Sequence, residues 1–205
     1  VHAHTPFALG LAAYRHARQR DRPLVASYHT PTAEYASYLA VRGVGQLEPA
    51  IARASEPYER WFFSRSDAVV VPSESTRRHL LEDVGVARNG PATAVEVVPN
   101  GVDVERFAPV DAAEFLARHG LGDVDRPLVG YTGRHGHEKC LDDVLAAVDG
   151  LDGAVVGGGD GPAREELEAE AAERGLDAHF FGFLDREELP AFYSALDAFL
   201  FPSPV

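Results

Sequence analysis

Short apolar runs alternate with helical segments along the whole chain, and this alternation limits the fold more than any other feature. Runs such as residues 68–71 and 154–156 are each followed by a segment whose apolar residues recur every three or four positions. Strands that alternate with helices in this way form parallel sheets with helices on both faces. The sequence therefore predicts an α/β protein with two Rossmann-like, doubly wound parallel-sheet domains, residues 1–110 and 127–205, joined by a linker at 111–126. We expect both domains to be incomplete, because each is short for its class.

Composition excludes several classes of function. The 205-residue chain has a net charge of −13, which argues against a general nucleic-acid binder and resembles the acidity of proteins from salt-adapted organisms. Its one cysteine, Cys140, excludes an internal disulfide and indicates a reducing compartment. No apolar run reaches membrane-spanning length, and the chain contains no methionine. We therefore expect an interior piece of a longer cytoplasmic protein, truncated at both ends.

Residues 127–141 contain the main candidate site. Leu128 to Tyr131 predict a buried strand, and the apolar residues from Leu141 onward have helical spacing. Arg134 and Lys139 lie between these elements, at the sheet edge where open α/β folds bind ligands. A guanidinium can bind a phosphate through two hydrogen bonds and an ammonium adds a compact charge, so the pair suits a diphosphate.

The use of cations in the chain strengthens this interpretation. The 19 Lys and Arg residues include a single lysine, Lys139, and the other 18 are arginines. The alternative is a solvated helix start, in which Lys139 pairs with Glu138. The spacing from Arg134, the strand edge and the scarcity of lysine favour the diphosphate site over this alternative.

Three further segments carry candidate ligand contacts. His29 follows the predicted strand at residues 24–28, where a histidine can bond a substrate hydroxyl or cap the strand, and position alone does not separate these roles. Residues 157–161 are rich in glycine and permit close backbone approach, although Pro162 breaks the dinucleotide-binding pattern. Asp123 and Asp125 spell a metal-binding D-x-D string, which chance explains better in so acidic a chain.

A small basic patch follows the first predicted helix. Four arginines, Arg15, Arg18, Arg20 and Arg22, lie near its carboxyl end, where cations are usually only solvated and matched to the helix dipole. The alternative is a contact with anionic lipid at the inner face of the membrane. Tyr35 and Tyr38 would support a lipid acceptor.

Eight motifs in order together resemble a known family. They are VHAHTP (1–6), VASYHTP (25–31), DAVVVPSEST (67–76), VVPNGVDVERFAP (97–109), GRHGHEK (133–139), GGGDGPARE (157–165), FFGFL (180–184) and DAFLFPS (197–203). The chain resembles the retaining glycosyltransferases of the two-Rossmann GT-B fold, family 4 (group 1), which includes bacterial and archaeal mannosyl- and glucosyltransferases. The resemblance implies transfer of a hexose from a UDP- or GDP-sugar to a hydroxyl of a lipid or glycan acceptor, with retention of configuration and without a metal or other cofactor.

The resemblance also implies roles for individual residues. Arg134 and Lys139 match the pair that holds the donor diphosphate, and His29 matches the histidine near the transferred sugar. The donor-binding positions are Gly133, Gly159, Gly161, Gly182, Phe183 and Leu184, of which the last three match the edge that contacts the nucleotide base. The segment that leads out of the acceptor domain and lines the cleft is matched by Asn100, Gly101 and Asp103.

Three departures from the family pattern matter. Cys140 stands where the family usually has glycine, and the sequence ends before the two glutamates, seven residues apart, that the family places after its last motif. The glycine-rich loop of the first strand is absent as well. We therefore expect residues 1–205 to be inactive alone. The alternative function is a GT-B-like subunit that binds a nucleotide sugar or a partner without catalysis; a sugar-nucleotide epimerase fits the motifs less well.

Overall fold

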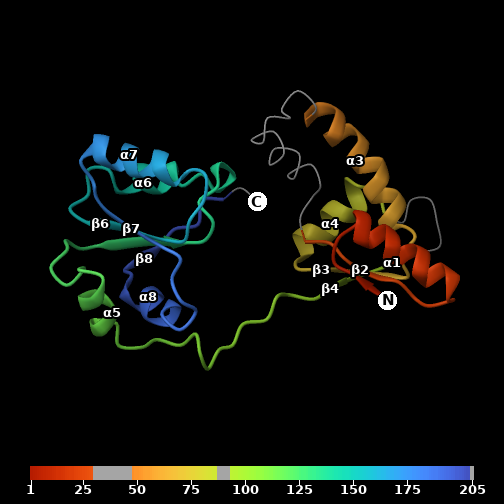
Figure 1. Cartoon of the computed structure of the whole chain (residues 1–205), viewed down its shortest axis with the longest axis horizontal. Coiled ribbons are helices and arrows are strands. Elements are labelled where there is room, and N and C mark those ends of the chain that lie inside the picture. The colour runs from red at the N-terminus through yellow and green to blue at the C-terminus, as the bar shows by residue number, and fades with distance from the viewer. Residues whose placement is uncertain (30–47, 87–92, 204–205) are drawn as a thin grey trace. The chain divides into compact units, whose positions relative to one another are not determined.

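The chain folds into two compact units, residues 1–101 and 102–205 (Figure 1). The structure, a computed structural model, describes residues 1–29, 48–86 and 93–203. Each unit contains one four-stranded sheet in which all paired strands are parallel. The predicted α/β class with two Rossmann-like parallel sheets is thus confirmed.

The first unit has the strand order β1-β2-β3-β4. Its elements are β1 His2–Ala3, α1 Ala8–Gln19, β2 Val25–Ser27, α3 Glu48–Phe63, β3 Ala68–Val71, α4 Glu74–Glu82 and β4 Ala94–Val97. Its core combines the buried valines of β3 with Phe62 and Phe63 of α3 and Leu80 of α4. The hydroxyl of Ser73 accepts a hydrogen bond from the amide of Thr76 at 3.2 Å, which makes Ser73 the cap that starts α4.

The second unit has the strand order β7-β6-β5-β8. Its elements are α5 Ala113–Arg118, β5 Leu128–Thr132, a short 3-10 helix η3 His137–Lys139, α6 Asp142–Val148, β6 Ala154–Gly158, α7 Arg164–Arg174, β7 Asp177–Gly182, α8 Leu189–Ala195 and β8 Ala198–Phe199. Helices α6 and α7 cover one face of the sheet, and α5 and α8 cover the other (Figure 1). Separate apolar clusters fill the two interfaces, as expected for a doubly wound sheet.

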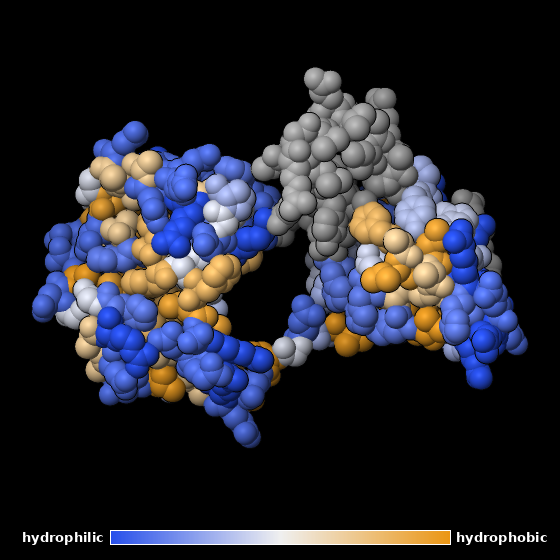
Figure 2. All heavy atoms as spheres, in the orientation of Figure 1, coloured by the Kyte–Doolittle hydropathy of each residue, from blue (hydrophilic) through white to orange (hydrophobic). Residues whose placement is uncertain are grey.

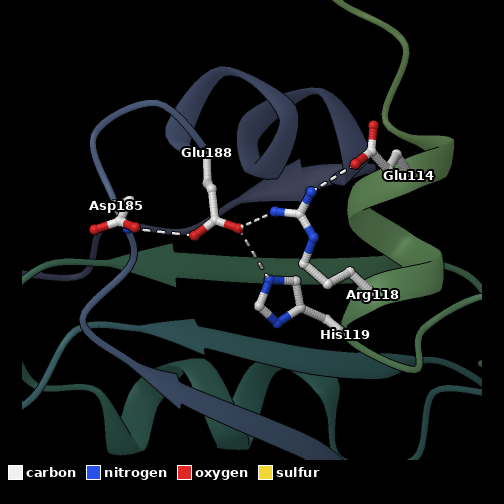
Figure 3. Close-up of polar contacts among 5 residues, drawn as sticks. All are labelled: Glu114, Arg118, His119, Asp185 and Glu188. Atoms are coloured by element: carbon white, nitrogen blue, oxygen red, sulfur yellow. Dashed lines mark hydrogen bonds and ion pairs between the residues drawn. The ribbon is translucent and has the colours of Figure 1, made fainter.

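The linker predicted at residues 111–126 is not a free connection. Phe115 of α5 and Leu121 are buried in the cluster that lies under α8. Arg118 donates hydrogen bonds of 2.6 Å to both Glu114 and Glu188, the latter lying just before α8 (Figure 3). The few apolar side chains of this polar segment thus complete the core of the second unit.

In each unit an aspartate that precedes one strand is hydrogen-bonded to the start of the neighbouring strand. In the second unit, Asp197 accepts hydrogen bonds from the amide of Leu128 at 2.7 Å and from Arg126 at 2.8 Å. In the first unit, Asp67 accepts a hydrogen bond of 2.7 Å from the amide of Leu24. The leading aspartates of the motifs DAFLFPS and DAVVVPSEST therefore have the same structural role.

The surface is mixed. In the view of Figure 2 the visible face of each unit is mainly hydrophilic, with separate apolar areas. Within residues 1–29, 48–86 and 93–203, no helix has the length and apolar character needed to cross a membrane.

Candidate functional site

The candidate site lies at the carboxyl edge of the second sheet. Because its four strands are parallel, the segments that follow them begin at one edge. Residues 133–141 follow β5, residues 159–163 follow β6, residues 183–188 follow β7 and residues 200–203 follow β8. The structure therefore brings together the predicted cations, the glycine turn and the predicted base-contacting edge of this unit.

Arg134 and Lys139 lie on one loop after β5. Arg134 forms an ion pair with Glu138, and both side chains remain about one-third exposed. The ammonium of Lys139 lies 3.4 Å from the hydroxyl oxygen of Ser203 and 5.8 Å from the centre of the Phe201 ring. The alternative that pairs Lys139 with Glu138 is wrong in its partner, since Glu138 binds Arg134. The two cations thus lie on one short segment, but each contacts different neighbours.

The glycines of the site have a packing role in the structure. A side chain on Gly159, which has φ +111°, would place its Cβ 1.9 Å from the carbonyl oxygen of Gly133. A Cβ on Gly161 would lie 2.3 Å from the carbonyl oxygen of His135. The amide of Gly159 also donates a 2.5 Å hydrogen bond to the carbonyl of Gly182, where φ is +75°. These positions require glycine for contact between loops, and their contact with a donor stays a prediction.

The two residues after Gly182 point in different directions. Phe183 is 84% exposed, which makes its ring the most accessible large apolar side chain of the unit's described residues. Leu184 instead packs against the core cluster that includes Phe192. Of the predicted base-contacting residues, Phe183 can therefore offer a ring, whereas Leu184 has its side chain committed to the interior.

Sequence reasoning missed the burial of His135. This residue follows Arg134 directly, yet its side chain is 0% exposed and faces the interior. Burial lowers the pKa of His135 from its ordinary value of 6.5, and the positive charge of Arg164 lowers it further against the raising effect of the Gly158 carbonyl. The signal available in the sequence was a histidine between two glycines within the predicted phosphate loop, at 133–136.

Cys140 adopts a backbone conformation that favours glycine. Its φ of 49° and ψ of 45° lie in the left-handed region. Its amide donates a 3.2 Å hydrogen bond to the carbonyl of His137, which closes η3. The structure thus explains why glycine is the usual residue at this point of the motif, and it shows that cysteine is accommodated there.

Histidines gather at the carboxyl edge of the first sheet. His29 follows β2 and is exposed, and its ring is parallel to that of His4 with 6.3 Å between centroids. The ring of His2 lies 4.2 Å from that of His4, and its Nε2 lies 2.8 Å from the hydroxyl of Ser27. Burial, followed by the neighbouring imidazole of His4, lowers the pKa of His2. His2 and His4 were missed as neighbours of His29, although both belong to the first motif.

The remaining predicted positions are exposed. Asn100 and Gly101 end the first unit, and Asp103, near the start of the second, accepts hydrogen bonds from the amides of Glu105 at 3.2 Å and Arg106 at 3.1 Å. Asp103 therefore stabilises a turn, and a cleft-lining role for the three residues stays a prediction. Tyr35 and Tyr38 lie outside the described residues.

No metal centre is formed by the described residues. Within them, no group of three or more His, Cys, Asp or Glu side chains is arranged to hold a metal ion. Asp123 and Asp125 of the D-x-D string are both exposed.

Comparison with known proteins identifies the family. The model of Glycosyltransferase Family 4 matches residues 1–106, and that of Glycosyl transferases group 1 matches residues 114–205. The chain belongs to glycosyltransferase family 4. The two matched segments lie one on each unit, so each of them contains one parallel sheet.

Named relatives agree with this assignment. The chain is 36% identical over 154 residues to the 2-deoxystreptamine glucosyltransferase of Streptomyces kanamyceticus, covering 71% of this chain and 39% of the relative. It is 32% identical over 202 residues to the GDP-mannose-dependent alpha-mannosyltransferase of Mycobacterium tuberculosis, covering 98% of this chain and 48% of the relative. The chain thus spans less than half of the length of these two family 4 members.

A solved structure supports the fold. The HepE protein of Anabaena, crystallised in complex with UDP, superposes with a TM-score of 0.72 at 20% identity, covering 100% of this chain and 53% of that protein. This similarity shows that the chain has the GT-B fold, which contains two Rossmann-like sheets.

Proposed function

We propose that this family 4 protein transfers a hexose from a nucleotide-diphosphate sugar to an acceptor hydroxyl, with retention of configuration. The observation that carries the proposal is the loop after β5, which holds Arg134 and Lys139 together at the carboxyl edge of the second sheet. Lys139 also lies beside Ser203 after β8, the strand that pairs with β5. Two cations at the edge of a parallel sheet suit the diphosphate of the donor.

The proposed chemistry needs charge stabilisation more than a strong base. The leaving nucleoside diphosphate gains negative charge in the transition state, and preorganised cations stabilise that charge most where it develops. Arg134 would bind phosphate oxygens through two hydrogen bonds, and Lys139 would add a compact charge. The acceptor hydroxyl attacks from the face that the diphosphate leaves, and the departing phosphate oxygen takes its proton. These steps involve no metal ion.

His29 would bind the transferred sugar. It lies at the carboxyl edge of the first sheet, where an imidazole can donate a hydrogen bond to a sugar hydroxyl. The parallel ring of His4 at 6.3 Å favours a defined orientation of the His29 ring. We propose His29 as a substrate-binding residue rather than as the general base.

The substrates are proposed as classes. The mycobacterial relative is named for GDP-mannose, and the Anabaena structure contains UDP, so both donor bases are candidates. The Streptomyces relative is named for 2-deoxystreptamine, a polyhydroxylated acceptor. We propose a lipid or glycan hydroxyl as the acceptor here.

Calorimetric titration tests the donor site. UDP-glucose and GDP-mannose are titrated, at high salt, into the unchanged chain and into the double variant Arg134→Ala/Lys139→Ala. We expect binding by the unchanged chain and at least a ~10-fold loss in the variant, equivalent to about 1.4 kcal/mol. The matched control is Arg174→Ala, which removes a surface cation at the far end of α7 and should leave donor affinity unchanged. Equal affinity in the double variant, or no binding of either donor by the unchanged chain, would refute the proposed site.

A further inference from the structure

His135 is the most unusual side chain of the second unit. It is fully buried, and neither of its ring nitrogens makes a hydrogen bond of full geometry within the described part of the chain, although the Gly158 carbonyl lies close enough to act on the ring. A buried polar group without a partner costs about 1–3 kcal/mol, so an apolar residue would be the more stable choice. A residue that is costly to stability and lies between Arg134 and η3 calls for a functional explanation.

The surroundings of the imidazole are apolar. Its ring lies 6.1 Å from that of Tyr131 on β5 and 6.0 Å from that of Phe180 on β7, measured between centroids. It lines a cavity of about 20 Å³ between the sheet and the helices α6 and α7. The other lining residues of the cavity from these helices and from β6 are Leu141 just before α6, Val144 and Leu145 of α6, Val155, Val156 and Gly157 of β6, and Leu167 of α7. The groups that would stabilise a charged imidazole there, the Gly158 carbonyl, Asp160 and Glu168, do not offset its burial.

The backbone of His135 joins two loops of the site. Its amide donates a 2.9 Å hydrogen bond to the carbonyl of Asp160, and its carbonyl accepts one of 2.9 Å from the amide of Ala163. Gly161 packs so closely on the His135 carbonyl that no side chain would fit between them. Any movement that exposes the imidazole must therefore break the connection between the loop after β5 and the start of α7.

The charges around the ring do not offset its burial. Burial lowers the pKa of His135, and Arg164 lowers it further, whereas the Gly158 carbonyl, Asp160 and Glu168 raise it. Tyr131 is the titratable group of β5, and the cavity residues of α6 and β7 are apolar. The charged groups on its own segment are Arg134, His137, Glu138 and Lys139.

We propose that neutral His135 is a positioning residue that holds the loop with Arg134 and Lys139 in its donor-binding conformation, and that protonation of His135 releases this loop. The inference rests on the donor-binding role proposed above for the two cations. An opened loop would expose the imidazole to water and carry both cations away from their places at the sheet edge. Donor binding would then weaken in mild acid.

The direction of the pH dependence follows from linkage. In the open loop the imidazole regains a pKa near 6.5, whereas in the closed loop the pKa is lower. Below pH 6.5 the open form therefore binds more protons than the closed form. The population of the closed form falls as the pH decreases from 6.5 to the lowered pKa. At pH 5.5 an ordinary histidine is about 90% protonated, so this loss can reach up to about tenfold.

Hydrogen exchange tests, without any donor, whether neutral His135 holds the loop closed. Protection factors of the amides of His135 and Ala163, corrected for intrinsic exchange rates, are compared at pH 7.5 and 5.5. We expect them to fall several-fold in the unchanged protein and to stay constant in His135→Leu, with His135→Gln as a second non-titrating variant. The matched control is His137→Gln, an exposed histidine of the same loop, which should behave like the unchanged protein. Identical pH profiles with and without His135 would overturn the proposal.

Donor affinity provides the second measurement. UDP-glucose and GDP-mannose are used because their diphosphates lack the terminal phosphate group that titrates near pH 6 in a free nucleoside diphosphate. We expect affinity to fall several-fold from pH 7.5 to 5.5 in the unchanged chain and in His137→Gln, but not in His135→Leu. Absence of donor binding at both pH values would refute the proposed donor site. Hydrogen exchange would still show whether His135 holds the loop closed. A ring of His135 that titrates near pH 6.5 by NMR in the unchanged protein, with full loop protection, would also overturn it.

Discussion

The ammonium of Lys139 lies 3.4 Å from the hydroxyl oxygen of Ser203, although the two residues are 64 positions apart. This contact links the loop after β5 to the segment after β8, and these two strands are neighbours in the sheet. The residues that form the proposed donor site thus depend on the strand order of the second unit, and substitutions around them give distinct expectations.

Glu138→Gln should strengthen donor binding. Glu138 forms an ion pair with Arg134, so its carboxylate would compete with the donor diphosphate for the guanidinium. Because partly exposed ion pairs contribute about 0.2–1 kcal/mol, we expect a gain of up to about fivefold in affinity by calorimetry. Glu173→Gln, at an exposed position of α7, is the control. A loss of affinity in Glu138→Gln would mean that the carboxylate orients Arg134 instead of competing for it.

Gly159→Ala should destabilise the second unit strongly. The added Cβ would meet the Gly133 carbonyl at 1.9 Å, and φ is +111°, so strain and overlap combine to about 3–4 kcal/mol. Gly150→Ala provides the comparison, since Gly150 has φ +79° with open space around it and should cost only about 1–2 kcal/mol. Urea denaturation measures both, and equal losses would contradict the close packing of the two loops.

Cys140→Gly should stabilise the protein. A non-glycine residue in the left-handed region costs about 1–2 kcal/mol, and the substitution removes this cost. The greater conformational freedom of glycine in the unfolded chain offsets about 0.5–1 kcal/mol of that gain. The expected net gain is about 0.5–1 kcal/mol in thermal or chemical denaturation. Cys140→Val should instead lose stability, because a β-branched residue is the least suited to this conformation. A less stable glycine variant would argue against strain at this position.

Asp197→Ala should weaken the attachment of β8 to β5. The carboxylate accepts hydrogen bonds from Leu128 and Arg126, and its loss should cost about 1–3 kcal/mol in chemical denaturation. The Leu128 amide, followed by Arg126, lowers the pKa of Asp197 below its ordinary 3.8. The contribution of Asp197 to the free energy of unfolding is therefore complete above about pH 4. It is lost as the pH falls through the lowered pKa of Asp197. Asp125→Ala, at an exposed aspartate nearby, should change neither the stability nor its acid dependence.

Replacing Arg15, Arg18 and Arg20 with serine should weaken binding to anionic vesicles, if the basic patch contacts lipid. Basic residues near such a surface contribute about 1 kcal/mol each at low salt. Arg18 is partly engaged, since it donates a 3.3 Å hydrogen bond to the carbonyl of Arg65 and stacks on Tyr14. Vesicles of neutral lipid and the variant Arg78→Ser serve as controls in a sedimentation assay. Unchanged binding would leave the patch with only a solvated role.

The sequence predicted the strands well because their signal is local. Apolar runs such as 68–71, 128–131 and 154–156 became strands with bounds that differ by few or no residues. Parallel arrangement followed from the alternation of strands with helices. The cap at Ser73 is an interaction of the same local kind, since its hydroxyl accepts a hydrogen bond from the residue three positions later.

The features that sequence analysis missed depend on contacts between distant residues. Asp197 and Leu128 are 69 positions apart, and nothing around either residue announces the hydrogen bond between them. Helix α5 lies within the predicted linker, and nothing in its local sequence shows that Phe115 completes a core formed by later elements. For the same reason the burial of His135 was unforeseen: its sequence neighbours are polar, and the side chains around it come from β5, β6, β7, α6 and α7.

The loop after β5 also offers an unusual opportunity for chemical labelling. It holds the only lysine and the only cysteine of the whole sequence, at the consecutive positions 139 and 140. An amine-reactive reagent would therefore have a single ε-amino target, and a thiol-reactive reagent a single thiol, both beside the proposed diphosphate position. Two orthogonal probes on adjacent residues would report occupancy of this edge in the native sequence, without any engineered attachment point.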